Sequence, residues 1–204
     1  FSVTANNACG ASPQQTLAVT VNPLPTVSVN SGSICLGQSF TLSPSGAATY
    51  TIQGGTAVVS PTSSSTYSVI GTSAAGCISS APASSSVTVN PLPLIALTPT
   101  NVSCNGFDNG SIAANVSSGT QPFTYIWSNS ANSSAITSLS PNNYSLTVTD
   151  VNGCADTSDA TITEPTLLTS AEIQNDSVSC FGRSDGSSTL QIAGGTTPYT
   201  IVWN

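Results

Sequence analysis

The seven residues Val-Thr-Val-Asn-Pro-Leu-Pro occur twice in this chain, at residues 19–25 and 87–93. Cys9 and Cys77 lie at the same 68-residue offset. Composition alone does not produce two identical proline-containing strings with a cysteine at a fixed distance before each, so the strings mark the ends of two similar modules. The chain is therefore a tandem array, and any function must fit a repeated module.

Two further alignments extend this repeat. Residues 102–128 align with residues 178–204 at an offset of 76, with 11 of 27 positions identical, and residues 67–77 align with residues 144–154 at an offset of 77. The alignments divide the chain into four predicted parts. These are the tail of an immunoglobulin-like module at 1–21, a complete module at 22–89, a second complete module at 90–164 and the head of a third at 165–204.

Modules of about 70 residues bury little surface and usually need covalent support. Two cysteines flank each complete module, so we predict one disulfide within each. The predicted pairs are Cys35 with Cys77 and Cys104 with Cys154, while Cys9 and Cys180 are expected to pair outside this sequence. Because disulfides persist in oxidising compartments, the pattern predicts an exported protein.

Short runs in which apolar and polar residues alternate predict β-strands with one buried face, as at residues 123–127 and 144–149. Further strands are predicted at residues 26–29, 39–43, 48–52, 57–60, 66–70, 85–89, 111–116 and 160–163. No segment has the period of a helix longer than a turn. The predicted fold class is all-β, with small antiparallel β-sandwiches of the immunoglobulin-like kind in tandem.

The few large side chains of each module are predicted to form its core, because exposing them would leave little else to bury. The predicted core residues are Tyr67, Phe123, Tyr125, Trp127 and Tyr144. Phe123, Tyr125 and Trp127 lie on one face of one predicted strand. The alternative interpretation of the aromatic residues is a platform for stacking sugar rings, formed by Tyr125, Trp127, Tyr199 and Trp203.

The two Asn-Pro-Leu-Pro strings are predicted to form short, stiff hinges between modules. Proline fixes its own φ and drives the preceding residue toward an extended conformation. The hinge residues are Asn22, Pro23, Pro25, Asn90, Pro91 and Pro93.

Composition excludes several kinds of activity. The chain contains no histidine or lysine, so it lacks the usual general base and Schiff-base nucleophile, and we predict that it is not an enzyme. Asp108 and Asp150 lie beside Asn and Gly and could supply oxygen ligands to calcium. We favour turns in which the Asp side chain bonds the backbone, and we expect no other cofactor.

The formal net charge is −7, and Arg183 is the only cationic side chain. Nucleic acids and anionic lipid surfaces bind basic patches, which this sequence cannot form. We therefore expect no nucleic-acid partner and no membrane insertion by this part of the chain.

Three motifs carry a resemblance to a known family. They are the Cys-Asn-Gly-Phe-Asp-Asn-Gly-Ser run at 104–111, the Gly-Thr-Gln-Pro-Phe-Thr-Tyr-Ile-Trp-Ser-Asn run at 119–129 and the Tyr-Ser-Leu-Thr-Val-Thr-Asp-Val-Asn-Gly-Cys run at 144–154. They resemble the SprB-type repeat of large surface adhesins in gliding Bacteroidetes. The module at 22–89 is similar to the PKD-like or immunoglobulin-like repeats found beside it.

The resemblance implies a long protein at the surface of a bacterium or secreted from it through a type IX system. Its expected role is a non-enzymatic structural repeat of an extracellular stalk, adhesin or filament. Expected partners are further modules of the same chain, other copies in a fibre, and surface glycans. The alternative function is a glycan-binding module of a secreted or surface protein.

Overall fold

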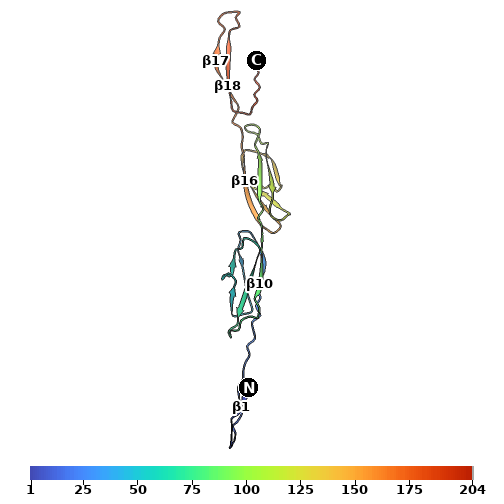
Figure 1. The fold of residues 1–204 in the computed structure, drawn as a ribbon. Coiled ribbons are helices and arrows are strands. Elements are labelled where there is room, and N and C mark those ends of the chain that lie inside the picture. Colours follow the sequence, from blue (N-terminus) through green and yellow to red (C-terminus); the bar gives the residue numbers. More distant parts are fainter. Residues whose placement is uncertain (204) are drawn as a thin grey trace. The chain divides into compact units, whose positions relative to one another are not determined.

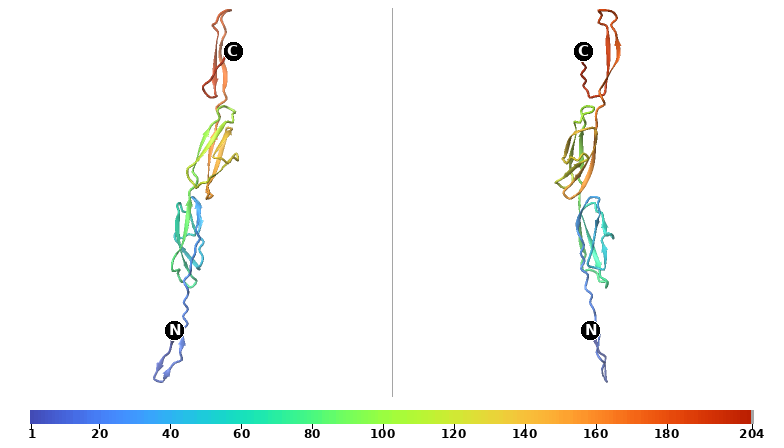
Figure 2. Two further views of the ribbon diagram at one scale, coloured as in Figure 1. Left: turned by 90° about the vertical axis from the view of Figure 1, so that its right-hand side faces the viewer. Right: turned by 180° about the vertical axis from the view of Figure 1, so that it is seen from behind.

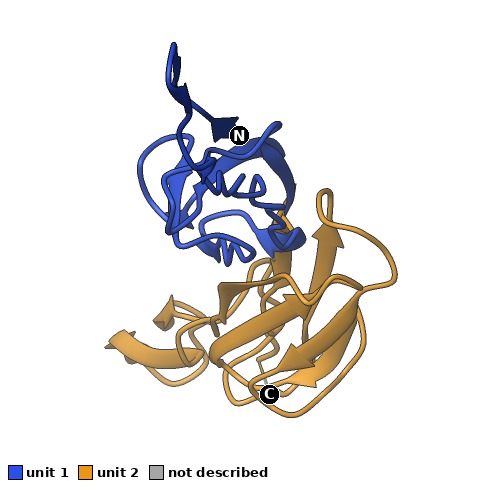
Figure 3. Cartoon of the chain, turned by 90° about the horizontal axis from the view of Figure 1, so that it is seen from below, with its two compact units in different colours: residues 1–89 blue, residues 90–204 orange. Residues whose placement is uncertain are grey.

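The structure is a computed structural model that describes residues 1–203, and its regular elements are all β-strands (Figure 1). No helix is present among these residues, so none could cross a membrane. The chain divides into two compact units, Phe1–Val89 and Asn90–Asn204 (Figure 3). Both complete modules are antiparallel β-sandwiches, as the alternating sequence pattern predicts.

The first complete module contains a four-stranded sheet in the order β5-β10-β9-β7, which faces the two-stranded sheet β6-β8. The strands are β5 (Gly32–Cys35), β6 (Phe40–Thr41), β7 (Thr49–Ile52), β8 (Val58–Val59), β9 (Ser65–Thr72) and β10 (Ala83–Asn90). Ile34, Leu42, Val59 and Val87 form its buried cluster, and Tyr67 packs against them. The predicted strand at 26–29 is only an isolated bridge between Ser28 and Ser45.

Residues 1–17 form one hairpin with two short ladders, and its side chains are exposed. β1 (Ser2–Val3) pairs with β4 (Gln15–Thr16), and β2 (Asn6–Asn7) pairs with β3 (Gly10–Ala11). Every residue from Phe1 to Val21 is exposed. This part of the chain therefore has no core of its own.

The second complete module is built from two three-stranded antiparallel sheets, β11-β12-β14 and β13-β15-β16. The first sheet contains β11 (Ile95–Thr100), β12 (Gly110–Val116) and β14 (Ala135–Leu139). The second contains β13 (Thr124–Trp127), β15 (Asn142–Thr149) and β16 (Ala155–Ile162). Along β15, Tyr144, Leu146 and Val148 are buried while the residues between them face outward, which is the period-two pattern of one covered face.

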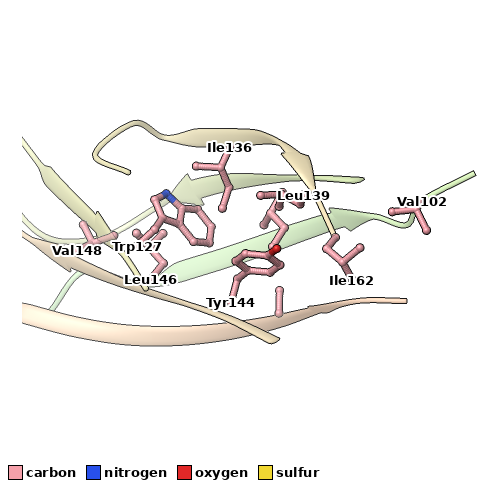
Figure 4. Close-up of a cluster of buried hydrophobic side chains, with 10 residues drawn as sticks. Val102, Trp127, Ile136, Leu139, Tyr144, Leu146, Val148 and Ile162 are labelled. Atoms are coloured by element: carbon pink, nitrogen blue, oxygen red, sulfur yellow. The ribbon is translucent and has the colours of Figure 1, made fainter. Parts of the chain in front are cut away.

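Trp127 lies at the centre of the buried cluster between these sheets (Figure 4). Only 2% of its surface is exposed, and its indole Nε1 donates a hydrogen bond of 2.9 Å to the carbonyl of Ser133. Tyr144 is also buried, while Phe123 and Tyr125 are half-buried and pack against the cluster. The aromatic residues of this strand are thus structural, and the buried indole has its polar atom satisfied.

Residues 165–203 contain one long hairpin, formed by β17 (Thr169–Asp176) and β18 (Ser187–Ala193) (Figure 2). Gln174, Asn175 and Asp176 pair with Thr189, Ser188 and Ser187. The residues 76 positions earlier, in β11 and β12, pair in the same register. The hairpin is therefore a second copy of the first two strands of the module at 90–164.

Replacing Trp127 by alanine should lower the free energy of unfolding of the second unit by about 3–5 kcal/mol, because it empties the centre of the cluster. The matched control is Ile126→Ala, since Ile126 is the preceding residue on the same strand and its side chain is 62% exposed. This control should cost less than about 1 kcal/mol. Urea denaturation monitored by circular dichroism measures the free energy of unfolding of both variants. Equal losses would contradict the assignment of Trp127 to the buried face and Ile126 to the exposed face of the strand.

Candidate functional site: the cysteine turns at the ends of the modules

Cys154 closes a tight turn between β15 and β16. The Asp150 amide donates to the carbonyl of Cys154 (2.9 Å), and the Gly153 amide donates to the carbonyl of Asp150 (3.1 Å). The Cys154 amide in turn donates to Asp150 Oδ1 (2.9 Å). Gly153 has a φ of 80°, a left-handed conformation that favours glycine. Asp150 and Gly153 together fix the position of Cys154.

The first module repeats this turn at Cys77. The Ser73 amide donates to the carbonyl of Cys77 (2.9 Å), and the Gly76 amide donates to the carbonyl of Ser73 (2.9 Å). The hydroxyl of Ser73 accepts the Cys77 amide (3.1 Å), which is the role that Asp150 Oδ1 has in the second module. The geometry of the turn therefore recurs although its acceptor residue changes.

Asp150 also ties this turn to the loop before β13. Its Oδ2 accepts the Thr120 amide (3.0 Å), and the Val151 amide donates to the Thr120 carbonyl (3.2 Å). Burial is the largest single influence on the carboxyl group and raises its pKa, but hydrogen bonds from the amides of Cys154, Thr120 and Asn152 and from the Asn152 side chain together outweigh it. The pKa of Asp150 is consequently lowered, and the carboxylate is an acceptor that holds two loops together.

Cys104 begins a different turn, which precedes β12. The Phe107 amide donates to the carbonyl of Cys104 (3.2 Å), and Asn109 Oδ1 accepts the Ser103 amide (3.0 Å). Glu164, just after β16, accepts the Gly106 amide through Oε2 (2.7 Å). The Cys104 turn is thus attached to the segment that leaves the module.

The third module repeats the Cys104 turn at Cys180. The Arg183 amide donates to the carbonyl of Cys180 (3.1 Å), and Asp185 Oδ1 accepts the Ser179 amide (3.0 Å). Hydrogen bonds from the hydroxyl and then the amide of Ser179 lower the pKa of Asp185. Asp185 occupies the place of Asn109 at the 76-residue offset. The sequence comparison did not reveal this shared hydrogen bond, because the acceptor is asparagine in one turn and aspartate in the other. Both side chains nevertheless bond the backbone in the same way.

The two cysteine turns of the second module lie at opposite ends of β16. Cys154 immediately precedes the strand, while Glu164, which contacts the Cys104 turn, follows it by two residues. At about 3.3 Å per residue, the eight residues of β16 separate the two ends by about 23 Å. A disulfide requires Cα atoms within about 7 Å.

The predicted Cys104–Cys154 disulfide is therefore wrong. Cys104 is a free, exposed thiol. Cys154 is fully buried and is disulfide-bonded. The repeat correctly identified which cysteines border the module, but it carried no information about the end at which each one lies.

The predicted Cys35–Cys77 disulfide is wrong for the same reason. Cys35 is disulfide-bonded, whereas Cys77 is free. Ile34, next to Cys35, packs in the same cluster as Val87, which pairs with Ser65 at the start of β9. Cys77 follows the other end of β9, so a strand of eight residues again separates the two cysteines.

The remaining cysteines, Cys9 and Cys180, are both free and exposed. Cys9 lies between β2 and β3, and its amide donates to Asn7 Oδ1 (2.8 Å). Pairing of Cys9 and Cys180 with cysteines beyond this sequence stays a prediction.

The two aspartates considered as calcium ligands are not brought together. Asp108 lies in the Cys104 turn and Asp150 lies at the opposite end of β16. Both oxygens of Asp150 already accept N–H donors, so its side chain forms a side-chain-to-backbone turn. Within residues 1–203, no group of three Cys, Asp or Glu side chains could hold a metal ion. Calcium binding would thus have to occur at two separate turns.

The second hinge string is partly absorbed into the module that follows it. Pro93 is fully buried, and a Cβ on Gly119 would lie 3.3 Å from its ring. Asn90 ends β10, and Pro91 is exposed. In the first string, Pro23 is exposed and Pro25 half-buried, while the carbonyl of Asn22 accepts a weak hydrogen bond from Cys77 Sγ (3.9 Å). Pro93 is therefore a packing residue as well as a conformational constraint.

Comparisons with known proteins bear on the family of the chain. The SprB repeat family model matches residues 96–132 and 173–204. No curated protein matches the chain. The matched segments contain the Cys104 and Cys180 turns together with the strands around them.

Several solved structures of immunoglobulin domains are also similar. The N-terminal eight Ig domains of Down Syndrome Cell Adhesion Molecule are 13% identical with a TM-score of 0.48, covering 78% of this chain and 30% of that one. Three Ig domains of titin are 12% identical with a TM-score of 0.35, covering 86% of this chain and 76% of that one. The amphioxus IgVJ-C2 molecule is 17% identical with a TM-score of 0.31, covering 65% and 99%. This chain thus spans less than a third of the first structure.

Replacing Asp150 by serine tests its role in the turn, because serine is the residue found at the equivalent position in the first module. The variant keeps an acceptor for Cys154 but loses the bond to Thr120, so its melting temperature should fall, and Asp150→Ala should lower it further. A control, Asp159→Ser, changes an exposed aspartate of β16 and should have little effect.

The same variants test the pH dependence. A folded pKa below the ordinary 3.8 means that ionised Asp150 stabilises the fold above about pH 3.8, and that this contribution is lost as the pH falls through the folded pKa. Melting temperatures between pH 6 and pH 2.5 should therefore fall less steeply for Asp150→Ser than for the unchanged chain. Parallel curves would contradict the assignment.

Labelling with a maleimide at neutral pH without reductant tests the cysteine assignment. Cys9, Cys104 and Cys180 should react quickly, and Cys77 more slowly because it is half-buried. Cys35 and Cys154 should react only after reduction. Peptide mass spectrometry shows which cysteines are labelled. If Cys104 and Cys154 were both protected from the maleimide, the predicted Cys104–Cys154 disulfide would be supported instead.

Proposed function

We propose that this chain, which carries SprB repeats at residues 96–132 and 173–204, is a section of the non-enzymatic stalk or filament of a long bacterial surface or secreted protein. SprB repeats and immunoglobulin-like sandwiches are structural modules of such proteins. The further modules of the same chain are its first partners. Export through a type IX system and assembly into fibres belong to the same proposal.

The observation that carries the proposal is the repetition of the same turns at the ends of successive modules. The Cys154 turn recurs at Cys77, and the Cys104 turn recurs at Cys180. The acceptor side chains change between copies, yet the hydrogen bonds stay the same. Repetition of module ends is what a stalk requires, because each module must join the next in the same way.

The chemistry of the side chains supports a structural role. Asp150, a buried carboxylate, accepts amide donors on both oxygens, so it serves the turn. Trp127 is buried with its N–H bonded inside the module, whereas the other tryptophan, Trp203, is 64% exposed. The contacts of Asp150 and Trp127 favour a stalk over a glycan-binding site at these two residues.

Single-molecule force spectroscopy in reducing buffer tests the stalk proposal. Each complete module should unfold separately and release about 250 Å of chain, since an extended residue spans about 3.6 Å at most. Trp127→Ala should lower the unfolding force of one of the two events and leave the other unchanged, because the two modules have separate cores.

The rival function predicts different results. A glycan array probed with the fluorescently labelled chain should give no signal above that of Trp203→Ala, which removes an exposed aromatic side chain, if the chain is a spacer. Selective binding to one class of glycan that the unchanged chain shows and the variant lacks would support a binding module. A single cooperative unfolding event that spans both modules would also contradict the stalk of independent repeats.

A further inference from the structure

The Cys104 turn contacts the part of the chain that begins the next SprB repeat. Asn105 Nδ2 donates to the carbonyl of Pro165 (3.1 Å). Thr196 Oγ1, from the loop after β18, donates to the carbonyl of Ser103, the residue before Cys104 (3.0 Å). The residues on either side of Cys104 in the sequence therefore contact the start of the next repeat and the loop that contains Thr196.

That loop has a defined counterpart in the complete module. Thr196 corresponds to Thr120 at the 76-residue offset. The Thr120 amide bonds one oxygen of Asp150, and the other oxygen of Asp150 bonds the Cys154 amide. In a completed copy of the repeat, the loop next to Cys104 would thus adjoin the turn equivalent to that of Cys154.

The bonding states of the cysteines supply independent evidence. Cys154 is disulfide-bonded although Cys104, the other cysteine of its module, is free. Cys35 is disulfide-bonded although Cys77, the other cysteine of its module, is free. Neither complete module therefore closes a disulfide between its own two cysteines.

We propose that Cys104 forms a disulfide with the last cysteine of the following SprB repeat, so that consecutive modules are stapled end to end. The bond forms by thiol–disulfide exchange with an oxidised small-molecule or protein disulfide. The thiolate of one cysteine attacks that disulfide and releases one thiol, and the second cysteine thiolate then attacks the mixed disulfide and releases the other. Two protein thiols are oxidised and one external disulfide is reduced to two thiols.

The staple resists separation of neighbouring modules under tension, which a bond inside one module would not do. It rests on the tandem stalk proposed above. Different experiments test the two proposals. Modules of a stalk can unfold one by one under force without any bond between them, whereas disulfide mapping tests the bond directly.

The test adds a copy of residues 129–164 after Asn204, which corresponds to Ser128, so that the second SprB repeat is completed. The added copy carries Val151→Ile, at a position that is exposed in the original, so that its cysteine peptide differs in mass. The chain is refolded with reduced and oxidised glutathione, digested without reduction and mapped by mass spectrometry. The expected product is a peptide containing Cys104 bonded to the added copy of Cys154.

Cys180 is the matched control, because it has the same turn as Cys104 but no module follows it in the extended chain. It should remain a free thiol. Thr196→Val, which removes the hydroxyl that bonds Ser103, should slow formation of the bond by about two- to tenfold, the effect expected from losing one hydrogen bond.

Fluorescence of Trp203, which is 64% exposed in this chain, reports whether the added segment completes the module, since burial shifts its emission to shorter wavelength. If the hybrid does not fold, the same mapping is made on a chain in which a second copy of residues 90–164 replaces residues 165–204. Cys104 bonded to Cys154 of its own module, or left free beside a folded neighbour, would overturn the proposal.

Discussion

A disulfide reaches only about 7 Å between Cα atoms, and a strand of eight residues is more than three times as long. In both complete modules such a strand, β9 or β16, lies between the two cysteine turns. Neither module can therefore close a disulfide between its own cysteines without losing its sheet. This geometric constraint assigns the cysteines to the ends of the modules and leaves the interior to be held by apolar packing.

Apolar packing in modules of this size depends on few residues. In the second module the two sheets close around Trp127 and its neighbours, and in the first a smaller cluster surrounds Leu42 and Val87. Asp150 illustrates how polar groups are used at the ends, since one carboxylate positions Cys154 and also ties down the loop that contains Thr120. Core and ends are thus stabilised by different interactions and can vary separately between repeats.

Much of the fold could be predicted because alternation reports directly on burial, as β15 shows. β5 was missed since glycine and serine fill half of it, and β14 was missed since it follows a stretch rich in asparagine and serine. β11 was missed because it contains Pro99, which is tolerated there on an edge strand. Only the last residues of β16 were predicted, because its first half is a polar edge exposed to solvent.

The repeat located the cysteine turns in the sequence. It could not show at which end of the module each turn lies. Equal spacing shows that Cys77 and Cys154 are equivalent, whereas the end of the module at which each lies depends on the direction of the strand between the turns. The equivalence of Ser73 and Asp150 was hidden for a similar reason, since a hydroxyl and a carboxylate accept the same amide. Such relations appear only when the hydrogen bonds are known.

The most direct measurement is disulfide mapping of the protein isolated, without reduction and with thiols blocked, from the cells that make it. Because Arg183 is the only tryptic site in this sequence, digestion requires a protease that cuts at aromatic residues. End-to-end stapling predicts that the Cys104 peptide is bonded to a cysteine of the following repeat. A Cys104 peptide bonded to the Cys154 peptide would contradict it.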